Sequence, residues 1–136
     1  LILCFYMRSF KKPDILKNKT VINNLFRNGK IIETPFLKCV WDFEKSLENH
    51  KKLKILISVP KKNINLATKR NRIKRQIREL LRHKKSQLTQ KLEKKINIAI
   101  VYKKRETYSY DVLDEKITVL LSTLIKKIWM LSFLFF

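Results

Sequence analysis

The sequence predicts a single α/β domain in which helices cover a small sheet. A chain of 136 residues with 45% hydrophobic residues suits one modest core and is too short for two ordinary domains. Apolar runs of strand length alternate with longer segments whose apolar residues recur at helical spacing. Between residues 54 and 102 the order is strand, long helix and strand, which is typical of a crossover between parallel strands.

The N-terminal third predicts an extended lead-in, a short helix and one strand. Pro13 disfavours helix at the residue before it, so residues 10–16 are expected to be extended. The helix should run from Lys17 to Gly29, the only glycine, which would end it in the left-handed conformation. The strand should span residues 31–43 with alternating faces. Its core face comprises Leu37, Cys39, Trp41 and Phe43, and its mixed face, toward solvent or ligand, comprises Phe36, Lys38, Val40 and Asp42.

The remainder of the chain predicts two further strands and two longer helices. Residues 44–54 are a charged loop, and residues 54–59 a buried strand that Pro60 closes. A basic helix starts near Ala67, and residues 96–102 form the next strand. The final helix is expected at 111–127, with an apolar face of Leu113, Ile117, Leu120, Leu121 and Leu124.

Positive charge is concentrated in the basic helix and the residues around it. Residues 61–85 carry eleven Lys or Arg and one acid, Glu79, which accounts for +10 of the chain's net +21. At about 100° per residue, the apolar residues fall in an arc of about 60° and the basic residues in an arc of about 100° on the far side. The apolar stripe comprises Leu66, Ile73, Ile77 and Leu80; the polar arc comprises Asn71, Lys74, Arg75, Arg78 and Arg82, with Arg70 and Arg72 on its flanks.

This pattern indicates a surface that binds a polyanion. Arg70, Lys74, Arg78 and Arg82 follow one another at i,i+4 spacing, where like charges repel unless a polyanion offsets them. The guanidinium fork of Arg can hold phosphate oxygens bidentately, and the amide of Asn71 can meet a sugar hydroxyl or a base edge. Nucleic acid is therefore the favoured partner, although an anionic membrane surface is an alternative.

The other functional residue types argue against a protein catalyst. The acids are scattered, and neither His50 nor His83 has a neighbouring ligand or base partner. Cys4 and Cys39 form no metal-ligand pattern and suggest reduced thiols in a cytoplasm.

The two ends of the chain are treated separately. Met7 is expected to be the natural start, with residues 1–6 a non-native extension, so the domain should cover 7–127. Residues 128–136 are apolar but shorter than the roughly 20 residues of a membrane span. We expect them to be a final helix turn on the core or a sticky tail, with no stable membrane insertion.

Several segments together resemble the bacterial ribonuclease P protein component. The family carries an RNR segment on a helix that follows a Ser-Val-x-Lys-Lys run. The similarity covers residues 8–127 and involves a dozen positions in order. It is carried by Arg70-Asn71-Arg72-Ile73-Lys74-Arg75 with Arg78-Glu79, by Ser58-Val59-Pro60-Lys61-Lys62, by Ala67, and by Phe26-Arg27-Asn28-Gly29-Lys30.

The resemblance implies a fold, a partner and a role. The fold would be an α+β sandwich with a mostly four-stranded sheet and a left-handed βαβ crossover around the RNR helix. The protein would bind the catalytic RNA subunit and precursor tRNA, and no DNA, to assist removal of the 5′ leader. It would be part of an endoribonuclease whose RNA, with Mg²⁺, performs the hydrolysis, while no protein side chain is catalytic or binds metal by itself. The RNA-binding residues would be Lys61, Lys62, Arg70, Asn71, Arg72, Lys74, Arg75, Arg78 and Arg82, and the leader cleft would be lined by Ile22, Phe26, Lys38 and Val40.

The chain departs from the family pattern at a few positions. Asn65 stands where the family often has Gly, and Asn tolerates the left-handed conformation. Thr68 and Lys69 replace more apolar residues, and Phe26 is the only clear aromatic residue of the cleft. The alternative functions are a non-enzymatic basic RNA-binding protein, such as a ribosomal or assembly protein, and a membrane-surface protein that uses the basic helix and the apolar end.

Overall fold

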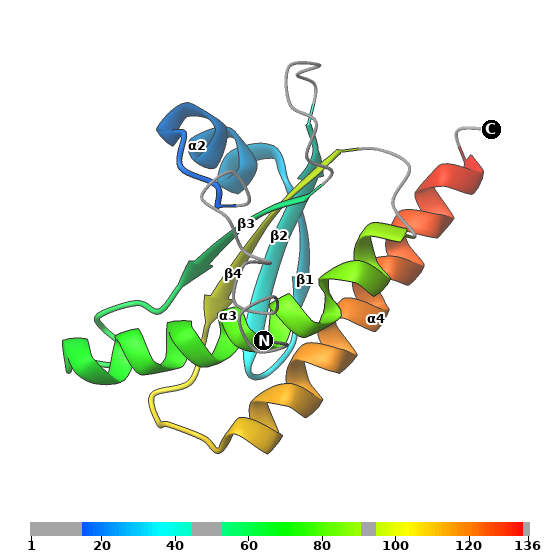
Figure 1. Cartoon of the computed structure of the whole chain (residues 1–136). Helices are drawn as coiled ribbons and strands as arrows, with labels where there is room; N and C mark the ends of the chain where they lie inside the picture. Colours follow the sequence, from blue (N-terminus) through cyan, green and yellow to red (C-terminus); the bar gives the residue numbers. More distant parts are fainter. Residues whose placement is uncertain (1–14, 45–52, 91–94, 135–136) are drawn as a thin grey trace, which may run out of the picture.

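The computed structural model describes residues 15–44, 53–90 and 95–134. Within these ranges four strands form one sheet in the order β1-β2-β4-β3, accompanied by three helices (Figure 1). In chain order the elements are α2 (Lys19–Asn28), β1 (Lys30–Glu33), β2 (Leu37–Phe43), β3 (Leu53–Ser58), α3 (Ala67–Gln90), β4 (Ile96–Tyr102) and α4 (Tyr110–Leu134).

The crossover predicted around the basic helix is confirmed. Strands β3 and β4 pair in parallel, with Leu53 opposite Ile96, and α3 connects them. Strand β4 also pairs with β2 in an antiparallel manner, so it lies between β2 and β3. Because both of its faces are covered, β4 is an almost uninterrupted apolar run in which only Asn97 is polar.

The single strand predicted at residues 31–43 is wrong, because the chain turns back between β1 and β2. Thr34 N donates to Leu37 O at 2.9 Å, and Pro35 in the turn has no N–H to offer a ladder. The two segments pair as an antiparallel hairpin with Lys30 opposite Trp41. The predicted core face is confirmed for β2, since Leu37, Cys39 and Trp41 are fully buried.

Helices cover both faces of the sheet (Figure 1). Helices α3 and α4 pack over one face, where Trp41, Ile77 and Ile117 belong to the larger of two hydrophobic clusters. Helix α2 packs on the other face over a smaller cluster of Leu16, Leu25, Val40 and Ala99. Val40, placed by the sequence on a face toward solvent or ligand, is therefore buried beneath α2.

The predicted buried stripe of α3 is confirmed for three of its four residues. Ile73, Ile77 and Leu80 are buried, and Leu81 and Leu88 extend the same face. Leu66 is an error: it precedes the helix and is 57% exposed. Outside the helix, a residue no longer follows the helical periodicity on which the prediction depended.

Gly29 ends α2 for a different reason from the one predicted. Its φ is −69° and its ψ 155°, and no described residue has a positive φ, which also places Asn65 outside the left-handed region. A Cβ at Gly29 would lie 2.3 Å from Leu25 O and 2.7 Å from Val40 Cγ1. Glycine is thus needed because the chain passes close to the small cluster under α2.

The last helix is longer than the predicted 111–127. Helix α4 continues to Leu134, and Ile128 is buried in the larger cluster. Trp129, Met130, Phe133 and Leu134 are exposed, so the end of α4 both packs on the core and presents apolar surface. None of the helices in the described ranges is long and apolar enough to cross a bilayer.

Candidate nucleic-acid interface

The buried side of α3 determines which of its basic residues face solvent. Ile73 and Ile77 anchor the helix on the larger cluster, and the opposite side of the helix is exposed. This side, which we call the basic face, comprises Asn71, Arg72, Arg75 and Arg78, all exposed, with the half-buried Lys74 at its edge. Lys61 and Lys62 are exposed in the turn before the helix. The structure thus brings together seven of the nine predicted RNA-binding residues as open surface.

Arg70 has a structural role beside any role in binding. Its Nη1 donates to Ile64 O at 3.1 Å and to Asn65 O at 2.6 Å. Ile64 is itself buried, and its N–H donates to Pro60 O at 3.1 Å. The Arg70 side chain therefore fastens the 60–66 turn to the first turn of α3.

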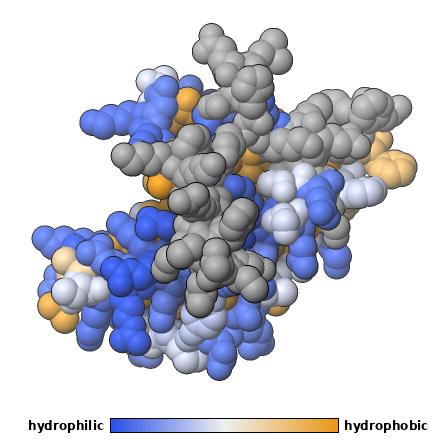
Figure 2. Space-filling model, in the orientation of Figure 1, coloured by the Kyte–Doolittle hydropathy of each residue, from blue (hydrophilic) through white to orange (hydrophobic). Residues whose placement is uncertain are grey.

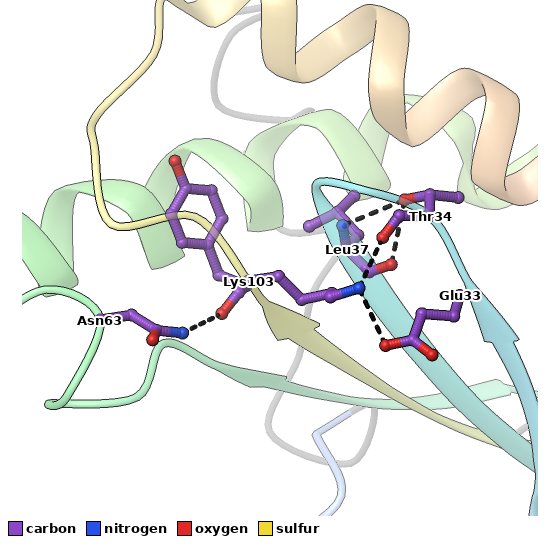
Figure 3. A network of polar contacts seen from close by, with 6 residues as sticks. Glu33, Thr34, Leu37, Asn63 and Lys103 are labelled. Carbon is purple, nitrogen blue, oxygen red and sulfur yellow. Dashed lines mark hydrogen bonds and ion pairs between the residues drawn. The ribbon is translucent and has the colours of Figure 1, made fainter.

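A polar network connects this turn to the rest of the sheet (Figure 3). Asn63 Nδ2 donates to Tyr102 O at 3.0 Å, at the end of β4. The next residue, Lys103, donates through Nζ to Thr34 O at 3.0 Å and pairs with Glu33 Oε1 at 2.8 Å. The hydrogen bond and the charge of Lys103 lower the pKa of Glu33. The β1–β2 turn, the end of β4 and the start of α3 are thus held together, which positions the basic face.

The second half of α3 is different, because acidic residues lie against its basic side chains. Arg82 was placed on the exposed arc, but its side chain is only 10% exposed and pairs with Glu79. His83 Nε2 lies 3.2 Å from the same carboxylate, and Lys84 Nζ lies 2.9 Å from Asp114 Oδ1 on α4. Arg82 thus does not present open surface at the position that the helical wheel predicts. The open positive surface therefore lies in the first half of the helix and the turn before it.

The predicted leader-cleft residues separate into surface and core. Phe26 on α2 is 43% exposed, and Ile22 on the same helix is half-buried. Lys38 on β2 is half-buried. It points to the α2 side of the sheet, because it lies two residues before Val40 and so shares its face. Val40 is 1% exposed beneath α2, so it does not lie on open surface with the other three.

A hollow does lie between α2 and the sheet, but other residues line it. Its volume is about 360 Å³, and Asn97 borders it with a side chain that is almost fully buried. Among the described residues, Asn97 Oδ1 and Glu44 Oε2 are buried without a hydrogen-bond partner. Oxygen acceptors of this kind suit donors rather than phosphates. The lining comprises Val21, Asn24, Leu25, Asn28, Asp42, Phe43, Glu44 and Asn97.

The sequence analysis did not predict this hollow, although the sequence contains one signal of it. Asn97 is the only polar residue within the apolar strand β4, and a buried amide in such a run requires a partner or a ligand. The other lining residues come from separate segments, and only the folded sheet places Asn97 opposite Asp42.

The described part of the chain contains no group of three or more His, Cys, Asp or Glu residues that could hold a metal ion. Cys39 has a free thiol, and burial raises its pKa to about 12, which makes it unreactive at neutral pH. His50 and Cys4 lie outside the described residues.

Comparison with known sequences gives one family. The Ribonuclease P family model matches residues 10–125. The ribonuclease P protein component of Chlorobium phaeobacteroides is 34% identical over 87 residues, which are 61% of this chain and 58% of that protein. The corresponding protein of Chlorobaculum tepidum is 29% identical over 103 residues, which are 69% of this chain and 67% of its own length. The match therefore spans little more than half of the length of the Chlorobium phaeobacteroides protein.

Solved structures show the same fold. The RNase P protein of Staphylococcus aureus superposes with a TM-score of 0.69 at 19% identity, over 82% of this chain and 94% of that one. The RNase P protein of Thermotoga maritima gives a TM-score of 0.64 at 22% identity, over 79% and 94% of the two chains. With the family model covering most of the sequence and the fold shared, this chain belongs to the Ribonuclease P family of proteins.

Proposed function

We propose that this protein is the protein subunit of ribonuclease P, which binds the catalytic RNA and the 5′ leader of precursor tRNA and assists endonucleolytic removal of the leader. The observation that carries the proposal is the basic face of α3. Arg72, Arg75 and Arg78 are exposed on it. They project from a helix that is packed on the sheet along its other side.

The geometry of the basic face suits a folded RNA backbone. Successive exposed arginines at 72, 75 and 78 lie about one helical turn apart, so neighbouring guanidinium groups can reach neighbouring phosphates. Because the turn before α3 is fastened by Arg70 and Asn63, the side chains project from a fixed base. Less ordering is then required when RNA binds.

The leader is proposed to lie on the α2 side of the sheet. Phe26 offers an exposed ring on which a base can stack, an interaction typically worth about 1–3 kcal/mol per base. Lys38 supplies a cation close to this surface for a phosphate.

The protein contributes position and charge, and the RNA contributes the reaction. Mg²⁺ bound by the RNA would supply the Lewis-acid chemistry of the hydrolysis. The positive charge of the protein lowers the repulsion between catalytic RNA and precursor tRNA, which also favours metal binding by the RNA at low Mg²⁺. We place this activity in the cytoplasm, and the free thiol of Cys39 is in keeping with a reducing compartment.

The test is a reconstituted cleavage reaction. The protein is mixed with catalytic RNA and precursor tRNA at low Mg²⁺, and the release of the 5′ leader is compared with that by RNA alone. We expect the protein to accelerate cleavage and Arg75→Ala/Arg78→Ala to abolish most of the gain. An RNA-binding protein of another kind would bind the RNA without accelerating cleavage, and that outcome would refute the proposal.

A matched variant separates the basic face from total charge. Lys126→Ala/Lys127→Ala removes the same number of charges from exposed positions on α4. In filter binding, Arg75→Ala/Arg78→Ala should reduce the slope of log affinity against log salt by about 2, because two phosphate contacts are lost. The α4 variant should leave that slope nearly unchanged. Equal effects of the two variants would mean that binding depends on net charge and not on the basic face.

A further inference from the structure

The outer side of α4 changes character along the helix. In its first four turns this side carries Asp111, Glu115 and Ser122, which are exposed and polar, and one exposed apolar residue, Val119. In its last turns it carries Trp129, Met130, Phe133 and Leu134, which are 54%, 65%, 80% and 79% exposed. Exposed large apolar side chains gathered in this way are typical of a surface that contacts a partner.

These residues are not the edge of the core-facing stripe. At about 100° per residue, Lys126, Trp129, Met130 and Phe133 fall within an arc of about 100°. The buried residues Leu121, Leu124 and Ile128 lie on the opposite side of the helix. The end of α4 is thus apolar on two sides, one against the sheet and one open.

The open side of α4 also contains a hollow. Ile125, Lys126, Trp129 and Met130 line a shallow hollow of about 370 Å³ beside the Trp129 ring. Figure 2 shows hydrophobic surface emerging at the right-hand end of the molecule, where α4 ends. Lys126 and Lys127 are exposed at the start of this segment. We call residues 126–134 the apolar end of α4.

The net positive charge of the chain indicates which partner suits the apolar end of α4. Two copies of a chain with a net charge of +21 repel each other, which disfavours self-association through a small apolar contact. An anionic lipid bilayer has the complementary charge and accepts Trp, Phe, Leu and Met at its interface, while lysines extend to the head groups. We propose that the apolar end of α4 docks the protein on the surface of an anionic membrane.

Docking of this kind is peripheral and leaves the RNA surface accessible. The chain has no helix in its described part that could cross the bilayer, and interfacial binding requires none. In Figure 1 the C-terminal end of α4 and the N-terminal end of α3 lie at opposite ends of the molecule. A membrane under α4 would therefore leave the basic face, which lies in the first half of α3, free, so that RNA and lipid can be bound together. The inference goes beyond ribonuclease P activity and does not depend on it.

Tryptophan fluorescence of the full chain provides a direct test. The chain has two tryptophans: Trp41 is fully buried and Trp129 is 54% exposed. With vesicles of mixed phosphatidylcholine and phosphatidylglycerol, the emission should shift to the blue as Trp129 leaves water. Vesicles of phosphatidylcholine alone should give little shift. Trp129→Phe should retain vesicle binding in flotation but lose the shift, and a shift that persists in this variant would overturn the proposal.

Matched variants on one helix locate the contact. Met130→Ser/Phe133→Ser should weaken vesicle affinity about tenfold or more, because two large apolar side chains no longer enter the interface. Val119→Ser replaces a side chain that is also 53% exposed on α4, three turns earlier, and should leave the affinity unchanged. Neither variant should alter cleavage of precursor tRNA in solution.

Two further outcomes would overturn the proposal. In the first, Arg75→Ala/Arg78→Ala abolishes vesicle binding and Met130→Ser/Phe133→Ser does not, which would assign the lipid contact to α3. In the second, sedimentation equilibrium shows a dimer that Met130→Ser/Phe133→Ser dissociates, and vesicles bind no protein, which would assign the surface to a second copy.

Discussion

The two faces of the sheet are covered to very different extents. On one face α3 and α4 bury a large cluster that includes Trp41, Ile77 and Ile117. On the other, the single helix α2 contributes Leu25 to a cluster of four buried residues that includes Val40 of β2. A polar hollow remains beside this cluster. Buried apolar area is the main source of stability, so the first face holds the fold together. The second has fewer packing constraints, and it is there that the proposed leader surface lies.

This difference has a consequence for the basic helix. Because α3 belongs to the well-packed side, its basic face is presented by a rigid element rather than a mobile loop. The α2 side can instead adjust to a ligand, since a helix held by few buried contacts opens at low cost.

Core truncations should differ between the faces. Ile77→Ala, at a fully buried site, should lower the free energy of unfolding by about 2–5 kcal/mol. Leu25→Ala should cost about 2 kcal/mol, the low end of that range, because the small cluster borders solvent and can collapse or hydrate. Urea denaturation followed by circular dichroism measures both, and a larger loss for Leu25→Ala would contradict the comparison.

High pH should weaken the packed face. Burial raises the pKa of Cys39 from 9.0 to about 12, so the fold favours the neutral thiol. The contribution of the buried neutral thiol to the free energy of unfolding is fully present below pH 9.0 and is lost as the pH rises toward 12. Between about pH 8 and about pH 10.5 the free energy of unfolding should fall by about 2 kcal/mol from this group.

The same pH comparison in Cys39→Ala supplies the control. Burial also raises the pKa of Tyr102 to about 12, so some loss at high pH should remain in this variant. The loss should nevertheless be smaller than in the parent protein. Identical pH dependence in the two proteins would show that the Cys39 thiol is not responsible.

Gly29→Ala tests the close approach under α2. The added methyl would lie 2.7 Å from Val40 Cγ1 and 2.3 Å from Leu25 O, so α2 must shift. We expect a cost of about 1–2 kcal/mol from this overpacking. Hydrogen exchange of the α2 amides should accelerate more than that of α3 amides. Asn23→Ala, at an exposed α2 position, should change stability by less than about 0.5 kcal/mol.

Substitutions of two arginines of α3 should distinguish a role in holding the 60–66 turn from a role in binding RNA. Arg70→Ala loses the hydrogen bonds to Ile64 O and Asn65 O and should cost about 1 kcal/mol of stability. Arg75→Ala should change stability by less than about 0.5 kcal/mol, since its side chain is exposed. Both should weaken RNA binding, measured by filter binding at fixed salt. Equal stability of the two variants in urea would mean that Arg70 does not hold the turn.

Local periodicity in the sequence was sufficient to predict most of the regular elements and the charge that they carry. Helical spacing selected the buried side of α3 through Ile73 and Ile77, and strand alternation selected Leu37 and Trp41, because both patterns depend on neighbours a few residues away. The ordered matches around residues 58–75 were also sufficient to indicate the family, which the family model confirms.

Features that depend on contacts between distant segments could be recognised only in the folded molecule. The break at Thr34, which separates β1 from β2, interrupts a run that reads as one strand. The burial of Val40 requires α2 to fold back over the sheet, and the pairing of Lys84 with Asp114 requires α4 to lie along α3. Periodicity describes one element at a time, whereas burial depends on what packs against it. For that reason the positive charge of α3 could be predicted from the sequence, but its open first half and its paired second half could be distinguished only in the fold.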